Sequence, residues 1–170
     1  VTGDGSALTG IAGGISEADR WELGVALALA TGSNTFATAN WARTSGNGFG
    51  HIGTGMSESS GVFSFPSTGF WLITFEAKMG GTVDCREMEV DLWTTEDNST
   101  YAEAAQSIVH IKRTYTSGYT TYTHAQCSFL FDVTNVSNDK VKVSGITTAT
   151  PTEIFNGSNT CLTFIKLGDT

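Results

Sequence analysis

Short runs in which apolar and polar residues alternate recur along the chain, and they constrain its fold more than any other feature. Alternation at every second position is typical of a β-strand with one buried face. The clearest run covers residues 85–93, with Met88, Val90 and Leu92 on one face and Glu87, Glu89 and Asp91 on the face that we expect to be solvated. About eight to ten such strands lie at intervals of roughly 8–15 residues, and no segment has a convincing helical pattern. The chain is therefore predicted to be all-β, folded as a jelly-roll β-sandwich.

Two other segments carry strong strand patterns. Residues 21–29 are apolar at every second position, which favours a strand over a helix, although Ser16 and Asp19 imitate a helix capping box. Residues 62–75 predict a hairpin that turns at 66–69. The second strand of this hairpin is apolar on both faces, so both of its faces must be covered.

The charge balance excludes several classes of partner. The net charge is −8, and the nine Lys and Arg residues are spread thinly from Arg20 to Lys166. They cannot form the cationic stripe that a phosphate backbone requires, so we expect neither nucleic acid nor an anionic membrane surface as a partner. No apolar stretch approaches the roughly 18 residues of a membrane span, so no membrane insertion is expected.

Residues with the potential for chemistry are present but are not arranged as a known catalytic motif. There is no G-x-S-x-G, and the carboxylate spacing within residues 85–93, although compatible with a glycosidase pair, is what an ordinary strand face produces. The histidines are far apart in the sequence, and no role is assigned to them: His51, His110 and His124. In a trimer of this chain, one His from each copy could meet on the threefold axis and hold a metal or an anion, or act as a pH switch. We therefore predict that the protein is not an enzyme.

No metal or cofactor is predicted, with calcium as the alternative. Residues 96–98 and 135–139 supply oxygen ligands, but neither segment has the D-x-D-x-D-G spacing of a calcium loop. Cys85, Cys127 and Cys161 are odd in number, lack the spacing of metal ligands and each lie in a strand-like run. They are predicted to be buried free thiols, which implies assembly in a reducing compartment.

Tyrosines concentrate near one predicted turn, at Tyr115, Tyr119 and Tyr122, among Ser and Thr residues. Aromatic rings beside hydroxyl groups are suited to stacking on sugar faces and to hydrogen bonding with sugar hydroxyls. These tyrosines are the candidate ligand-binding residues, and the alternative is a pair of exposed strands joined by a polar turn.

Residues 61–75 resemble the complement-q globular head and tumour-necrosis-factor superfamily, in which a strand reading G-x-F-x-x-P-x-x-G precedes an aromatic-rich strand. Residues 159–167 are similar to the last strand of that superfamily. The resemblance implies a ten-stranded jelly roll that assembles as a tight homotrimer. The candidate trimer-interface residues are Phe70, Trp71, Phe75 and Phe164. The alternative is that these aromatic residues lie inside one sandwich, with one face of their strand under a loop.

Residues 3–11, with the sequence GDGSALTGI, resemble the G-D-G-S-x-L-T-G-I segment of bacteriophage tail-fibre proteins. Residues 18–21, 53–56 and 164–169 also resemble terminal domains of phage structural proteins. The resemblance implies that residues 1–15 are a fibre-shaft stub or linker and that 16–170 are a jelly-roll head. It also implies assembly in the host bacterial cytoplasm and a location in the virion. Because the chain starts at Val1 without a Met, we expect it to be an excised or processed C-terminal piece of a longer protein.

The function implied by the phage resemblance is receptor binding at the tip of a fibre. The receptor would be a host surface glycan or protein, and other virion proteins would be bound through the N-terminal shaft. The alternative is a capsid decoration or head-fibre protein that stabilises the virion. A complement-q-like signalling module fits the fold but not the shaft motif, and a depolymerase is the least favoured reading.

Overall fold

The computed structural model describes residues 14–46, 48–112, 119–150, 152–154 and 157–170. Within these residues every regular element is a β-strand and no helix occurs, which confirms the all-β prediction. The strands are β1 (Ala18–Leu23), β2 (Leu27–Ala28), β3 (Thr35–Phe36), β4 (Trp41–Arg43), β5 (Ser57–Ser59), β6 (Val62–Ser64), β7 (Gly69–Gly81), β8 (Cys85–Thr95), β9 (Ala102–Ile111), β10 (Thr121–Val133), β11 (Lys140–Thr147), β12 (Thr152–Ile154) and β13 (Gly157–Gly168).

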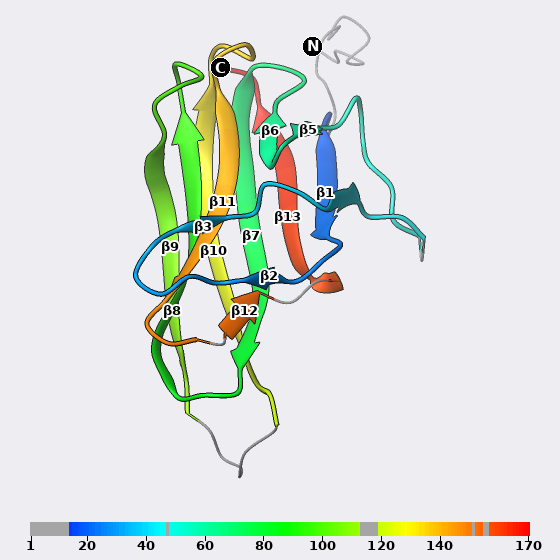
Figure 1. Cartoon of the computed structure of the whole chain (residues 1–170). Coiled ribbons are helices and arrows are strands. Elements are labelled where there is room, and N and C mark those ends of the chain that lie inside the picture. Colours follow the sequence, from blue (N-terminus) through cyan, green and yellow to red (C-terminus); the bar gives the residue numbers. More distant parts are fainter. Residues whose placement is uncertain (1–13, 47, 113–118, 151, 155–156) are drawn as a thin grey trace, which may run out of the picture.

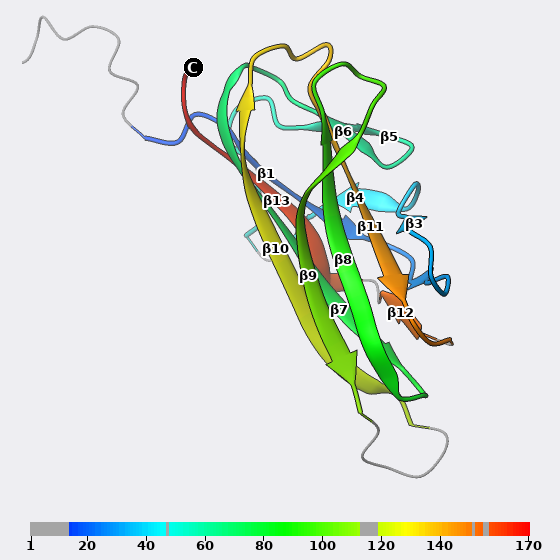
Figure 2. The ribbon, with the colours of Figure 1, turned by 90° about the vertical axis from the view of Figure 1, so that its left-hand side faces the viewer.

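The strands form two antiparallel sheets that pack face to face (Figures 1 and 2). One, here called the β7 sheet, has the order β2-β12-β7-β13-β1-β4, with β10 paired to the other edge of β7. The second, the β8 sheet, has the order β5-β6-β11-β8-β9, with β3 paired to β11. Sequence neighbours frequently lie in different sheets, which is the topology of a jelly roll.

The core fills the space between the sheets and is rich in aromatic rings. Met88, Val90 and Leu92 of β8 are fully buried there, as the alternation of residues 85–93 predicts. Phe63 and Phe164 bring their ring centroids to 5.4 Å of each other across the sandwich. Complete burial of one such large apolar side chain is worth about 1.5–3 kcal/mol, so this cluster is a main source of the stability of the sandwich.

Residues 62–75 do not form the predicted hairpin. Strand β6 pairs with β5 and β11, whereas β7 pairs with β10, β12 and β13, so the segment between them crosses from one sheet to the other. The crossing ends at Gly69, whose φ is +136° and whose missing Cβ would lie 2.4 Å from the carbonyl oxygen of Gly168. A glycine is needed there because the last turn of the crossing lies directly against the end of β13.

Residues 21–29 form two strands rather than the single predicted strand. Strand β1 ends at Leu23, and the amide of Gly24 donates a hydrogen bond to the carbonyl of Asn40, outside the ladder with β13. The side chain of Val25 is consequently 54% exposed instead of lying on a buried face. The chain then enters β2, at the far edge of the β7 sheet.

Candidate functional site

The molecule has two ends of different character (Figures 1 and 2). The start of β1 and the end of β13 lie at one of them, here called the terminal end, where Ala18 pairs with Ile165. The connection from β7 to β8, the end of β9 and the start of β10 lie at the opposite end, here called the distal end. Residues that enter or leave the domain and residues in the distal connections are therefore separated by the length of the sandwich.

The predicted tyrosine site lies at the distal end as far as the structure describes it. Tyr119 is 73% exposed, and Tyr122, near the start of β10, is 52% exposed. The ammonium of Lys78 lies 4.0 Å from the centroid of the Tyr122 ring, a cation–π contact. Tyr115 falls outside the described residues. The two described tyrosines thus offer aromatic surface at the end opposite the termini.

A pocket of about 310 Å³ lies at the same end. It is lined by the glycine pair that ends β7, by one carboxylate, by four threonines and by two apolar residues of the β2 segment: Gly80, Gly81, Glu153, Thr82, Thr120, Thr150, Thr152, Ala28 and Leu29. The threonines present both methyl and hydroxyl groups, so the pocket can bind a ligand that is partly apolar and partly hydroxylated. We call it the threonine pocket.

The strand register sets Tyr122 beside this pocket. Gly80 of β7 pairs with Tyr122 on one side and with Glu153 on the other, and Glu153 pairs in turn with Ala28. Directly paired residues of neighbouring strands share a face of the sheet. Tyr122 and Glu153 therefore flank a position that has no side chain. The sequence indicated the tyrosines but not the pocket, because the pocket depends on the pairing of strands far apart in the chain.

A second cavity at the distal end, of about 510 Å³, is basic in character. Arg86, His110 and Lys112 contribute to its lining, together with Asp84 and the buried Cys85. Arg86 and Lys112 give the cavity two positive charges, against one negative charge from Asp84, so it can attract an anionic group locally. Asp84, which lines this cavity, follows Thr82, which lines the threonine pocket, by two residues in the β7–β8 connection.

The outer face of the β7 sheet carries an apolar row at the terminal end. One residue from each of five neighbouring segments lies in it, directly paired in the order Leu130, Leu72, Ile165, Ala18 and Ile52. Leu130 is 54% and Ile52 49% exposed, and the exposed Phe70 and Leu167 flank the row. The next row towards the distal end is polar, since it contains Ser128, Thr74 and Thr163. A continuous exposed apolar strip of this kind is typical of a surface that another chain covers.

Three of the four predicted interface residues are not at a surface. Trp71, Phe75 and Phe164 have at most 1% of their area exposed and pack inside the chain's own core, so their assignment to a trimer interface is wrong. Phe70 alone is exposed, at 39%. The reason is the strand period: residues 71, 73 and 75 point inward, and the outward positions are occupied by Phe70 and Leu72.

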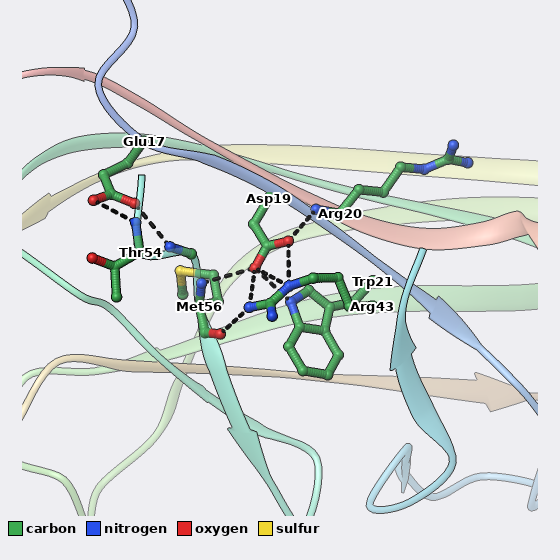
Figure 3. A network of polar contacts seen from close by, with 8 residues as sticks. Glu17, Asp19, Arg20, Trp21, Arg43, Thr54 and Met56 are labelled. Carbon is green, nitrogen blue, oxygen red and sulfur yellow. Dashed lines mark hydrogen bonds and ion pairs between the residues drawn. The ribbon is translucent and has the colours of Figure 1, made fainter. Parts of the chain in front are cut away.

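A buried carboxylate organises the terminal end (Figure 3). Asp19, whose side chain is 1% exposed, binds Arg43 through two contacts of 2.9 Å and accepts hydrogen bonds from the Trp21 indole and from the amide of Met56. Arg43 also donates to the carbonyl of Met56 at 2.7 Å. These bonds tie β1 and β4 to residues 53–56, so we assign the network to folding rather than to chemistry. Apart from the unlike charges at positions 19 and 43, no pattern in the sequence indicates this network.

The Asp91 carboxyl is buried, contrary to the expectation that it would be solvated with Glu87 and Glu89. It is 1% exposed, accepts a 2.8 Å hydrogen bond from the hydroxyl of Ser144, and has its Oδ1 atom buried without a hydrogen-bond partner among the described residues. Burial raises the pKa of Asp91 to about 6; the nearby carboxylates of Glu103 and Glu89 act in the same direction, and the Ser144 bond opposes them.

The cover over Asp91 comes from a distant segment. Trp93 donates its indole N–H to Ser144 at 2.8 Å, and Phe36, in the short strand β3 on β11, packs against the Trp93 ring at 5.7 Å. Alternation within residues 85–93 contains no information about this cover.

The predicted calcium segments use their carboxylates within their own turns. Asp97 accepts hydrogen bonds from the amides of Ser99 and Thr100, and these bonds hold the pKa of its carboxyl well below its usual range. Asp139 accepts from the amides of Thr134 and Asn135. The described ranges contain no group of three or more His, Cys, Asp or Glu residues arranged to hold a metal ion.

The histidines do not converge in the described structure. His110 lies on β9 and His124 on β10, in different sheets, and His51 lies in the segment between β4 and β5. All three are exposed.

The three cysteines are buried and free, as predicted: Cys85, Cys127 and Cys161. Burial raises the pKa of Cys127 to about 12 and that of Cys161 to about 11, so both remain protonated at neutral pH.

Comparison with solved structures defines the class of fold. The chain is similar to murine APRIL in its crystal structure at pH 8.0, with a TM-score of 0.63 and 14% sequence identity over 89% of this chain and 98% of that chain. It is also similar to the Eiger TNF of S. frugiperda, with a TM-score of 0.62 and 12% identity over 90% of this chain and 93% of that chain. The protein therefore has a TNF-like jelly-roll fold, as residues 61–75 led us to expect.

Sequence comparison adds no closer relationship. No protein-family profile matches the chain, and no curated protein sequence matches it. No helix able to cross a lipid bilayer occurs in the described part of the chain.

Proposed function

We propose that this chain forms the homotrimeric head of a bacteriophage tail fibre and binds a receptor on the host cell surface through its distal end. The observation that carries the proposal is the separation of the two ends. The chain enters the sandwich at the terminal end, next to the apolar row, whereas the exposed tyrosines, the threonine pocket and the 510 Å³ cavity lie at the opposite end. A further cavity of about 540 Å³, lined by residues 94–102 of the β8–β9 connection, lies at the terminal end and is not assigned to binding. The resemblance of residues 3–11 to tail-fibre proteins supports the terminal end as the attachment to a shaft.

The apolar row supports a trimer in which each copy covers the outer β7 sheet of its neighbours. In a single copy, Leu130 and Ile52 would remain about half exposed to water. Burial of apolar area is worth roughly 25 cal/mol per Å², which favours association of copies through this strip. Three heads held together place three distal sites on one fibre, so that weak individual contacts combine into high avidity.

The location and partners follow from the same proposal. The protein would be assembled in the cytoplasm of the host bacterium and reside in the virion, joined to other virion proteins through residues 1–15. Binding of the receptor requires no cofactor and no catalysis in this mechanism.

The trimer is tested by sedimentation of the purified chain. We expect a species of three chains for the wild type, against 18.0 kDa for one chain. Leu130→Glu and Leu72→Glu should sediment as single chains, because a carboxylate in the row cannot be desolvated without a partner. Ile108→Glu is the matched control, because Ile108 is 51% exposed on β9 of the other sheet. A wild-type chain that sediments as a monomer would contradict the trimer.

Receptor binding is tested with fluorescently labelled trimer on candidate host cells. We expect saturable binding that is weakened by Tyr119→Ala and Tyr122→Ala, and unchanged by Tyr101→Ala in the β8–β9 connection. Immunogold labelling of virions should find the chain at fibre tips. Labelling over purified heads at a copy number set by capsid symmetry would instead assign it to capsid decoration.

A further inference from the structure

We infer that the threonine pocket is a subsite for a single ring of a neutral saccharide. The inference deepens the proposed function, because it names the class of receptor that the distal end recognises and rests on that proposal for its biological role. The floor, the walls and the size of the pocket each support this assignment.

The floor is made of backbone. Gly80 and Gly81 end β7 between β10 and β12, so neither position carries a side chain; Gly80 opens the outer face of the sheet and Gly81 the inner face. Tyr122 and Glu153, on the strands either side of Gly80, stand two strand spacings apart, roughly 10 Å. Tyr122 and Glu153 therefore flank Gly80 on one face of the sheet, with Glu153 lining the pocket and Tyr122 next to it.

The walls suit a hydroxylated ring with apolar faces. Thr82 and Thr120 stand at the β7 and β10 side, and Thr150 and Thr152 at the β12 side. The hydroxyl of Thr152 donates to the carbonyl of Ala149 at 2.9 Å, which fixes its orientation and leaves its lone pairs as acceptors. Threonine methyls and the side chains of Ala28 and Leu29, which also line the pocket, can contact the C–H face of a sugar while hydroxyls and backbone groups bind its edge.

Glu153 sets the charge selectivity. A carboxylate can accept hydrogen bonds from two neighbouring sugar hydroxyls, one to each oxygen. The same charge repels the carboxylate of a uronic or sialic acid. The pocket should therefore prefer a neutral or N-acetylated hexose, whereas an acidic sugar would be drawn to the separate basic cavity lined by Arg86, His110 and Lys112.

The size limits the ligand to one ring. Pockets for small ligands span about 300–1,000 Å³, and the volume of about 310 Å³ lies at the lower end of that range. A single small site gives weak affinity, which is consistent with a function that depends on three copies bound at once.

The test uses the whole chain and follows its threonine methyl groups by NMR. Threonine methyl groups are ¹³C-labelled, and methyl glycosides of glucose, galactose and N-acetylglucosamine are titrated in, with glucuronic acid as the acidic comparison. We expect saturable shifts of the methyl signals of Thr82, Thr120, Thr150 and Thr152 with at least one neutral glycoside, and no such shifts with glucuronic acid.

Two variants and two matched controls link any binding to the pocket. Ala28→Phe places a ring at the pocket edge from an exposed position of β2, and Glu153→Gln removes the charge; each should weaken binding about tenfold or more. Ala42→Phe, at an exposed position of β4 on the opposite edge of the sheet, and Glu22→Gln on β1 should leave it unchanged. Equal effects of Ala28→Phe and Ala42→Phe would overturn the assignment.

The outcomes separate this inference from the proposed function. If labelled trimer binds host cells but no neutral glycoside shifts the four methyl signals, the saccharide subsite is refuted and receptor binding stands. If neutral glycosides bind in the pocket but the trimer binds no host cell, the fibre-head proposal fails and the subsite stands. Preferential binding of glucuronic acid that depends on Arg86 and not on Ala28 would place recognition in the basic cavity and refute the inference.

Discussion

Replacing Asp91 by Asn is expected to stabilise the protein at neutral pH. In the folded chain the Asp91 carboxyl is buried beneath Trp93 and Ser144, and its pKa is raised from 3.8 to about 6. The folded state therefore holds a proton between about pH 4 and pH 6 that the unfolded chain has released, so the free energy of unfolding falls as pH rises through that window. At 1.36 kcal/mol per pKa unit, the charged carboxylate lowers stability at pH 7 by roughly 3 kcal/mol.

Asparagine retains an oxygen that can accept the Ser144 hydrogen bond and removes the charge, so Asp91→Asn should recover much of that amount. The assay is urea unfolding followed by tryptophan fluorescence at one fixed protein concentration, repeated from pH 4 to pH 7.5. The variant should exceed the wild type by about 2–3 kcal/mol at pH 7 and by almost nothing at pH 4. Asp132→Asn, at an exposed position of β10, is the control. A variant that is less stable at pH 7, or a difference that does not change with pH, would refute the reasoning.

Two further substitutions test the terminal end and a tight turn. Arg43→Ala leaves the Asp19 carboxylate buried without its guanidinium partner and should lower the free energy of unfolding by about 2–3 kcal/mol. This is below the cost of breaking a fully buried pair because the Arg43 side chain is 35% exposed. A loss below about 1 kcal/mol in urea unfolding would contradict the role assigned to Arg43. Gly61→Ala should destabilise the protein far more than Gly46→Ala, although both glycines have positive φ. A Cβ at Gly61 would lie 2.2 Å from the carbonyl oxygen of Ala37, whereas none of the described atoms lies within 4 Å of a Cβ at Gly46. Equal shifts of the thermal midpoint in the two variants would show that backbone conformation alone sets the cost.

Local pattern was sufficient to predict which residues of a strand face the core, but not which strands pair. The period of two in residues 85–93 identified Met88, Val90 and Leu92 because a strand alternates its side chains whatever its neighbours are. The pairing of residues 62–75 could not be read in the same way. A turn sequence such as 66–69 is compatible with a hairpin and with a crossing between sheets, and only contacts with β10, β11 and β13 distinguish them.

The candidate site was predicted in part for the same reason. Tyr119 and Tyr122 were recognised from composition, and the structure adds that they lie just before and at the start of β10, at the distal end. The interface prediction chose the largest aromatic side chains, whereas the strand period buries Trp71 and exposes Leu72. The depression at Gly80 depends on pairings with residues about 40 and 70 positions further along the chain, which no local window of sequence contains.

Strand β7 combines three requirements in 13 residues. Its odd-numbered side chains such as Trp71 fill the interior, Leu72 lies in the strip available to other copies, and Gly80 leaves the opening beside Tyr122. Losing or gaining one residue within β7 would exchange its inward-facing and outward-facing side chains. The interior packing, the apolar row and the opening at Gly80 would then be lost together. Insertions and deletions should therefore be confined to the connections at either end, and chains with this fold should be able to vary those connections while β7 keeps its residue count.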